Sequence, residues 1–160
     1  MSLGFDFTNM MAAALPEGQG ITLSEWESAA APFAAAHAAV HARTDDLGFL
    51  TLPHNTALLA QSEAVAQWAD GRFTDVLLLG IGGSALGPIA LRTALCAPQW
   101  NALTAEQRGG KPRLHVLDNV DPASIAAVLS RLTLASTLVL VVSKSGGTVE
   151  TMAQYLIVRE

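Results

Sequence analysis

The chain has 160 residues, of which 51% are hydrophobic and 14% are charged, and its formal net charge at pH 7 is −5. This composition argues against a disordered chain, and the negative charge argues against a nucleic-acid or acidic-membrane partner. The single cysteine, Cys96, excludes an intrachain disulfide and fits a reducing compartment. The N-terminus has no basic leader and no apolar run is long enough to span a membrane, so the sequence predicts a cytoplasmic protein.

Residues 1–73 are predicted to form a helical N-terminal segment. After an irregular lead-in over residues 1–20, a capping box that starts at Thr22 or at Ser24 marks the beginning of a helix. Alanine carries this helix to about residue 43. Pro32 lies inside it and is expected to kink the helix or to split it in two.

A second helix is predicted over residues 55–69, after a connector over residues 44–53 that contains Gly48 and Pro53. Apolar and small residues recur at helical spacing along it. They predict an inner face made of Leu58, Ser62, Val65 and Ala69.

From Asp75 onward the pattern changes to an alternation of strands and helices, which predicts a second domain over residues 74–160. A polar insert over residues 98–112 separates the first helix of this domain from its second strand. The expected strands cover residues 75–79, 114–118 and 137–142, and the expected helices end or begin near Cys96, Asp121, Arg131 and Thr148. The last helix is expected to be still running at Glu160, the final residue.

This order of elements predicts an α/β fold, the first part of a doubly wound parallel sheet with strand order 2-1-3. A fourth strand, beside the third, is expected to be encoded after Glu160.

The first strand runs directly into a glycine-rich turn, Gly80-Ile81-Gly82-Gly83-Ser84. A strand, a glycine turn and a helix start together direct free backbone N–H groups at an anion. The turn also fits the loose dinucleotide pattern G-x-G-x-x-A, although Asp118 lies much farther along the chain than that pattern requires. A third interpretation is that the glycines only permit close packing of the strand and the helix.

The third strand runs into a turn of the same kind, which contains Ser143, Lys144, Ser145, Gly146, Gly147 and Thr148. Three hydroxyls and two glycines before a helix start predict a phosphate-binding loop. The alternative is a serine-rich loop in which Thr148 only caps the helix. Lys144 is ambiguous, because its ammonium group can face solvent while its N–H meets the ligand.

The two turns carry a family resemblance. The stretches GIGGSALGP at residues 80–88 and SKSGGTVET at residues 143–151 resemble the sugar isomerase (SIS) family and, within it, the phosphoglucose isomerases. LGFLTLP and LDNVDP extend the resemblance to residues 47–160. The resemblance implies that Gly83 and Ser84 contact the sugar phosphate and that residues 143–148 form the phosphate loop. It also implies that Glu150 orients a catalytic histidine during ring opening.

Members of this family interconvert glucose 6-phosphate and fructose 6-phosphate. The resemblance implies that this chain is an N-terminal part of such an isomerase, without metal or organic cofactor, and that the intact protein is a homodimer. The proton-transferring glutamate, the histidine and a late lysine would then lie beyond Glu160, so the chain alone is expected to be inactive. The rival hypotheses are a non-catalytic SIS module that binds a sugar phosphate and a dinucleotide-binding dehydrogenase domain.

The histidines and tryptophans suggest packing rather than chemistry. His37 and His41 have the spacing of a metal pair on a helix, but no third ligand is evident, so a surface or packed pair is expected. His115 is expected to be a hydrogen-bonded core residue, and His54 to cap a helix. Trp26, Trp68 and Trp100 are expected to be packing residues.

Overall fold

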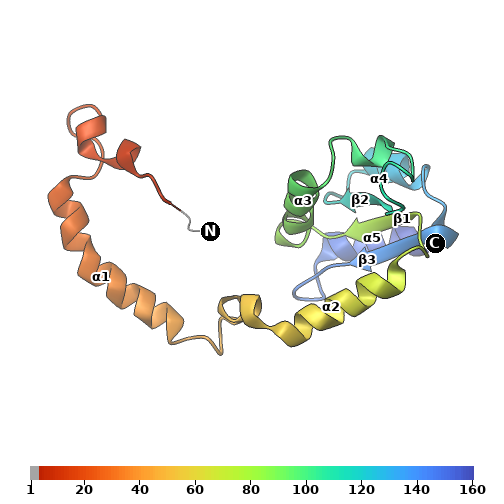
Figure 1. Ribbon diagram of the computed structural model, residues 1–160, viewed down its shortest axis with the longest axis horizontal. Coiled ribbons are helices and arrows are strands. Elements are labelled where there is room, and N and C mark those ends of the chain that lie inside the picture. Colours follow the sequence, from red (N-terminus) through yellow and green to blue (C-terminus); the bar gives the residue numbers. More distant parts are fainter. Residues whose placement is uncertain (1–3) are drawn as a thin grey trace. The chain divides into compact units, whose positions relative to one another are not determined.

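The computed structural model describes residues 4–160, which form two compact units with the boundary between Leu59 and Ala60 (Figure 1). This boundary falls inside helix α2, Thr56–Ala69. The domain division predicted after residue 73 stays a prediction. Each unit is described separately below.

The first unit is built around one long helix, α1, which spans Leu23–His41. The capping box is formed by Thr22, whose Oγ1 accepts a hydrogen bond from Glu25 N at 3.2 Å while Glu25 Oε2 accepts one from Thr22 N at 2.9 Å. The helix continues through Pro32, so the predicted split is wrong. Proline removes a single N–H donor, and the alanine-rich flanks sustain the remaining ladder.

Short turns of 3₁₀ helix replace the irregular segments expected on either side of α1. The lead-in contains the turns Thr8–Met10 and Ala12–Ala14 and a parallel bridge between Met11 and Ile21. The connector contains two further turns, Gly48–Leu50 and Leu52–His54.

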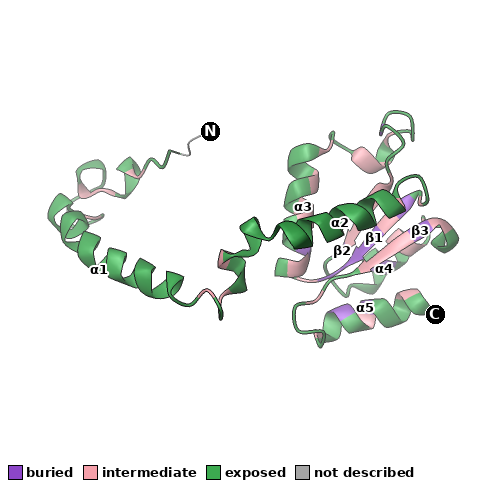
Figure 2. Ribbon diagram, turned by 60° about the horizontal axis from the view of Figure 1, so that its bottom comes forward, coloured by how far each residue is buried: buried purple, intermediate pink, exposed green. Residues whose placement is uncertain are grey.

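Helix α2 begins at Thr56, where Asn55 Oδ1 accepts a hydrogen bond from Leu58 N at 2.9 Å. Three of the four residues of its predicted inner face, Ser62, Val65 and Ala69, line a cavity together with Val76, Leu138 and Leu140, although the helix is largely exposed (Figure 2). Only Ala69, near the end of the helix, is half-buried.

The second unit contains a parallel sheet of three strands, β1 (Asp75–Leu79), β2 (Arg113–Leu117) and β3 (Thr137–Val141). The strands lie in the order β2-β1-β3, as predicted. In register, Leu77 of β1 lies opposite His115 of β2 and Val139 of β3. The connecting helices are α3 (Gly83–Leu95) and α4 (Pro122–Leu129), and α5 (Val149–Arg159) follows β3.

The end of α5 differs by one residue from the prediction. The helix ends at Arg159, and Glu160 occupies its C-cap position, so the expectation that the helix is still running at Glu160 is wrong. The carbonyl groups of the last turn of a helix have no following N–H groups to accept from, which loosens that turn. Glu160 is exposed and belongs to neither glycine-rich turn. No site role was predicted for Glu160 itself. The family resemblance places the catalytic glutamate, histidine and lysine after this position.

The core lies on one face of this sheet. Leu77, Leu79 and Leu117 are buried there against Ile125 of α4, and Val158 of α5 packs against the same cluster. The opposite face carries alternate strand residues, and Val76, Leu138 and Leu140 line a cavity there together with the second half of α2. Helices therefore lie on both faces of the sheet, which is the doubly wound arrangement (Figure 2).

A buried carboxylate anchors the amino ends of β1 and β2. Asp75 is fully buried, and its oxygens lie 2.7 Å from Arg113 Nη2, 2.9 Å from Thr74 Oγ1 and 3.0 Å from His115 Nε2. Burial opposes ionisation, but these hydrogen bonds and the charge of Arg113 outweigh it and hold the pKa of Asp75 below its usual value. His115 is thus a hydrogen-bonded core residue, as predicted.

Across residues 4–160, none of the helices has the length and apolar character needed to cross a membrane.

Candidate functional site: two turns at the carboxyl end of the sheet

The two glycine-rich turns follow the neighbouring strands β1 and β3 and approach each other closely. Val142 N donates to Leu79 O at 2.8 Å, which extends the β1–β3 ladder up to the start of the second turn. A Cβ atom placed on Gly80 would lie 3.2 Å from Val142 O and 3.1 Å from Ser84 Cβ. Glycine is favoured at position 80 because the backbone of the second turn passes so near the first.

The first turn also starts helix α3. Gly82 is the N-cap, with a φ of 54° that favours glycine, and Gly83 is the first helical residue. Ser84 N donates to Ile81 O at 3.1 Å, and the Ser84 side chain is half-buried beside Gly80. The turn places Gly83 and Ser84 at the positive end of the α3 dipole.

The second turn gathers its hydroxyls around Thr148, the N-cap residue of α5. Thr148 Oγ1 lies 3.2 Å from Ser143 Oγ and 3.5 Å from Ser145 Oγ. The same serine oxygens accept hydrogen bonds from Gly146 N at 3.0 Å and Gly147 N at 3.2 Å. Three hydroxyls and two backbone N–H groups therefore form one polar cluster at a helix N-terminus.

The interpretation of Thr148 as a simple cap does not fit this geometry. Thr148 makes no side-chain cap hydrogen bond to α5; its hydroxyl lies toward the two serines instead. Donors gathered at the positive end of a helix suit an oxyanion such as phosphate. The hydroxyls and N–H groups of the loop hydrogen-bond to one another, and a bound anion would replace some of these hydrogen bonds with its own.

Lys144 and Glu150 flank the hydroxyl cluster. Both side chains are exposed, and Glu150 lies in the first turn of α5, where a carboxylate interacts favourably with the helix dipole. Contact of Gly83, Ser84, Glu150 or the loop with a sugar phosphate stays a prediction.

Sequence analysis missed two polar residues of α5 that are buried against the sheet, Thr151 and Gln154. Gln154 Nε2 donates to Leu117 O and to Asn119 O, both at 3.0 Å, and so ties α5 to the carboxyl end of β2. Within residues 4–160, Thr151 Oγ1 and Gln154 Oε1 are buried without a hydrogen-bond partner. The available signal was two polar residues three positions apart on the inward face of a helix.

Sequence analysis also considered a dinucleotide site at Asp118 and a metal pair at His37 and His41. Asp118, the acidic residue that a dinucleotide site would use, is exposed after β2. In the described part of the chain, no group of three or more His, Cys, Asp or Glu side chains is placed to hold a metal ion. The rings of His37 and His41 lie 4.3 Å apart on α1, and both residues are exposed, so they form a surface pair.

Comparison with known proteins identifies relatives along most of the chain. The family model for phosphoglucose isomerase matches residues 59–160. Glucose-6-phosphate isomerase of Rubrobacter xylanophilus is 41% identical over 157 residues, which are 97% of this chain and 34% of that protein. The enzyme of the same name from Carboxydothermus hydrogenoformans is 43% identical over 116 residues, 72% of this chain and 25% of that protein.

A crystal structure of a glucose-6-phosphate isomerase from Chlamydia trachomatis matches 57% of this chain and 16% of that chain, with 36% identity and a TM-score of 0.46. The chain thus spans about a third or less of the length of the relatives it matches. Because the family model covers more than half of its residues, the chain belongs to the phosphoglucose isomerase family.

Proposed function

We propose that this chain is the amino-terminal part of a glucose-6-phosphate isomerase and that its two turns bind the phosphate group of the sugar. The supporting observation is the meeting of the turns: Gly80 lets the first turn approach Val142, and the second turn then presents Ser143, Ser145 and Thr148 beside it. Two adjacent helix N-termini, those of α3 and α5, direct their positive dipole ends to this edge.

Phosphate binding would contribute to the reaction by positioning. The sugar phosphate has to open its ring and move a proton between C1 and C2, which requires a carboxylate base held close to these carbons. Anchoring the phosphate fixes the distance from that base to the reacting carbons. Glu150 would orient a histidine supplied by the rest of the protein, and no metal or organic cofactor takes part.

The intact protein would then act in glycolysis and gluconeogenesis, in the cytoplasm and as a homodimer. These features rest on the family resemblance. The chain itself would supply only the phosphate anchor. Residues 1–160 contain no match to the family's catalytic glutamate, histidine and lysine motifs.

Titration calorimetry with glucose 6-phosphate, together with a coupled assay for fructose 6-phosphate, tests this proposal on the purified chain. We expect heat of binding and no isomerisation above a blank. Turnover by the chain would refute the assignment of the base to the rest of the protein. The absence of binding would refute the anchor.

NAD is added to the same preparation in a separate titration. Binding of NAD without binding of glucose 6-phosphate would favour the dinucleotide-binding alternative. A regulatory SIS module would instead bind the sugar phosphate and show no isomerisation even when the chain is joined to all of the sequence that follows it in the gene.

A further inference from the structure

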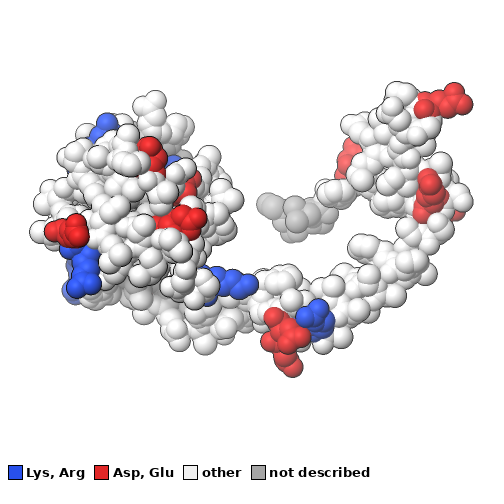
Figure 3. All heavy atoms as spheres, turned by 180° about the vertical axis from the view of Figure 1, so that it is seen from behind, with Lys and Arg blue, Asp and Glu red and all other residues white. Residues whose placement is uncertain are grey.

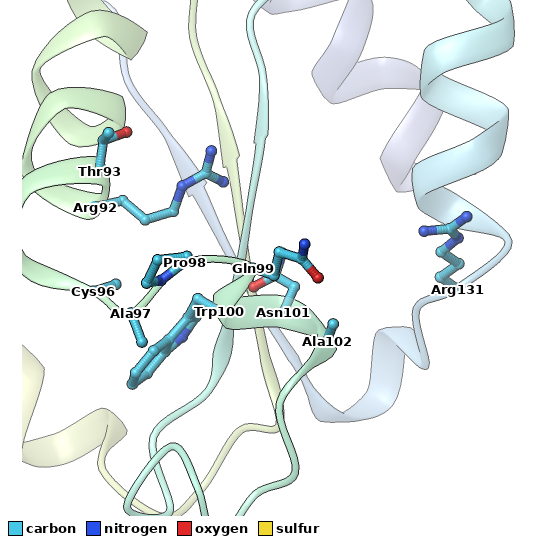
Figure 4. Close-up of a pocket in the computed structure, with 10 residues that line it drawn as sticks. All are labelled: Arg92, Thr93, Cys96, Ala97, Pro98, Gln99, Trp100, Asn101, Ala102 and Arg131. Atoms are coloured by element: carbon cyan, nitrogen blue, oxygen red, sulfur yellow. The ribbon is translucent and has the colours of Figure 1, made fainter.

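A second cavity lies at the opposite end of the sheet from the two turns. It has a volume of about 660 Å³ and is enclosed by the last turn of α3, the segment before β2 and a residue that follows α4 (Figure 4). These segments adjoin the amino ends of the strands, whereas the glycine-rich turns follow their carboxyl ends. A five-residue strand is about 16 Å long, so the two sites are separate.

The charged side chains around this cavity are all positive. Arg92 reaches it from α3, and Arg131 reaches it from the other side (Figure 4). No aspartate or glutamate is among the residues that line the cavity. In the described chain Lys111 pairs with Asp70 and Arg113 with Asp75, whereas neither cavity arginine belongs to an ion pair.

A structural role accounts for part of this arrangement. Arg92 lies in the last turn of α3 and donates to Leu114 O at 3.2 Å, and Arg131 follows the end of α4. Both positions are favourable for a cation near a helix C-terminus. That role explains each arginine singly but not why both line one cavity in a chain with a net charge of −5.

The wall between the two arginines is held in place by the fold. Trp100 Nε1 donates to Pro112 O at 3.0 Å, and the Asn101 amide both donates to Leu114 O at 2.8 Å and accepts from Leu114 N at 2.9 Å. Gln99, just before them, has a left-handed φ of 56°, which is costly for a residue other than glycine. Ala97, Pro98 and the Trp100 ring make part of this wall apolar (Figure 4).

We infer that this cavity binds a small organic anion, a phosphate or carboxylate attached to an apolar group, and that it does so independently of the loop before α5. The guanidinium groups of Arg92 and Arg131 are the two cationic donors of this cavity, and either can bind the anionic group, since guanidinium geometry matches both phosphate and carboxylate. The apolar wall around Trp100 accommodates the remainder of the ligand. This inference does not rest on the proposed isomerase function.

The only cysteine of the chain makes the inference testable, because Cys96 lines the same cavity and is half-buried. Cys96 is alkylated in separate reactions with iodoacetate, an anion, and with iodoacetamide, its neutral analogue. Mass spectrometry gives the rate of each reaction. The rate with iodoacetate is divided by the rate with iodoacetamide, and this ratio is divided by the same ratio for free N-acetylcysteine. The resulting normalised ratio measures the attraction of the cavity for anions. We expect a normalised ratio above one that falls as salt is added.

Two substitutions of Arg131, whose side chain is exposed, form a matched pair. Arg131→Gln removes the charge and should lower the normalised ratio by about two- to fivefold, the effect expected for one charge near a protein surface. Arg131→Lys keeps the charge and should leave the ratio near that of the parent chain. Equal ratios in the Gln and Lys variants would overturn the role of Arg131.

Protection of Cys96 identifies the ligand class. Phenyl phosphate and phenylacetate are compared as phosphate and carboxylate ligands, and benzyl alcohol is the neutral control. We expect slower alkylation by iodoacetamide with one or both anions, no effect of benzyl alcohol, and the same protection in a Thr148→Val chain. A lack of protection by both anions, or protection that disappears in the Thr148→Val chain, would overturn the inference.

Discussion

Thr148 is the residue that joins the hydroxyls of the loop before α5, because its Oγ1 lies within 3.5 Å of both serine oxygens. If it donates to a phosphate oxygen, Thr148→Val removes one charge-assisted hydrogen bond while keeping the shape of the side chain. We expect glucose 6-phosphate to bind more weakly by about 1.5–3 kcal/mol. Titration calorimetry on the purified chain measures the difference.

The control is Thr8→Val, in the first unit, where the Thr8 hydroxyl donates to the exposed Asp6 carboxylate at 2.7 Å. This variant should bind with the affinity of the parent chain. Equal affinities for the parent chain and Thr148→Val would reject a ligand contact for Thr148 and leave its hydroxyl with contacts to Ser143 and Ser145 only.

Asp75 predicts how stability changes with pH. Its pKa is lowered in the folded chain, so its ionised form contributes stability above the unfolded-state pKa of about 4, and this contribution is lost as the pH falls through the lower folded-state pKa. Asp75→Asn should reduce the free energy of unfolding at pH 7 by about 2–4 kcal/mol, because Arg113 loses its partner. The low end is favoured, since the Arg113 side chain is 35% exposed.

Urea unfolding at several pH values compares Asp75→Asn with Asp70→Asn, whose parent side chain forms an exposed pair with Lys111. The Asp70 variant should stay within about 0.5 kcal/mol of the parent chain at pH 7. In the Asp75 variant, the loss of stability below pH 4 should be less steep than in the parent chain. An unchanged slope would show that Asp75 does not control the acid transition.

Residue-scale contacts were predictable from the sequence where they are local. Ser143, Ser145 and Thr148 lie within six positions of one another, so a turn before a helix was enough to bring their hydroxyls together. Gln154 was missed because its partners, the carbonyls of Leu117 and Asn119, are 37 and 35 positions away. The partners of a buried polar side chain on a helix cannot be identified from sequence when they lie on a distant strand. Here the fold brings the end of β2 next to Gln154.

Gly80, just before α3, and Gly87, inside it, differ in how much space is available for a side chain. A Cβ on Gly80 would crowd Val142 O at 3.2 Å, whereas one on Gly87, in the helix interior, would meet nothing within 4 Å. Gly80→Ala should therefore displace the second turn, cost about 1–3 kcal/mol of stability and weaken binding of glucose 6-phosphate. Gly87→Ala should stabilise the chain by about 0.5–1 kcal/mol, since alanine favours the helix.

Thermal unfolding and titration calorimetry of the two variants give both quantities. If Gly80→Ala binds glucose 6-phosphate as tightly as Gly87→Ala, the close approach of the two turns is not needed for binding.

Element boundaries were predictable where a cap is encoded in neighbouring residues. Thr22 with Glu25 starts α1, and Asp121 starts α4 by accepting from Ser124 N at 2.7 Å, as expected from sequence. β2 begins at Arg113 and ends at Leu117, each one residue before the predicted bound, and the Arg113 side chain pairs with buried Asp75. β3 ends at Val141, one residue before its predicted end. Periodicity placed Ser62, Val65 and Ala69 on the face of α2 that lines a cavity with the sheet, but it did not indicate that Val65 stays 53% exposed there.

At the scale of the whole sheet, the strand order β2-β1-β3 was predicted from the doubly wound arrangement, in which right-handed crossovers place helices on both faces. The unpaired outer edge of β3 agrees with the prediction of a further strand beside it, whereas the sequence did not predict how β2 is covered. The outer edge of β2 is covered, since Asn101 and Arg92 occupy the backbone groups of Leu114. Within residues 4–160, no strand pairs with the outer edge of β3. Val141 at its end is 45% exposed.

The charged side chains of the second unit are spread thinly over its surface, and large areas carry neither sign (Figure 3). An open, apolar edge strand pairs readily with another chain. We therefore expect the 160-residue chain to self-associate through β3 of two copies, with a mass that rises with concentration in light scattering after size exclusion.

Two substitutions test whether β3 carries this association. Val141→Lys should shift the chain toward monomer, because a charged residue on an edge strand opposes pairing. Leu95→Lys is the control: it removes a side chain that is 79% exposed at the end of α3, away from β3, and should leave association unchanged. A monomer at all concentrations, or equal dissociation by both substitutions, would show that the edge of β3 does not recruit a second copy.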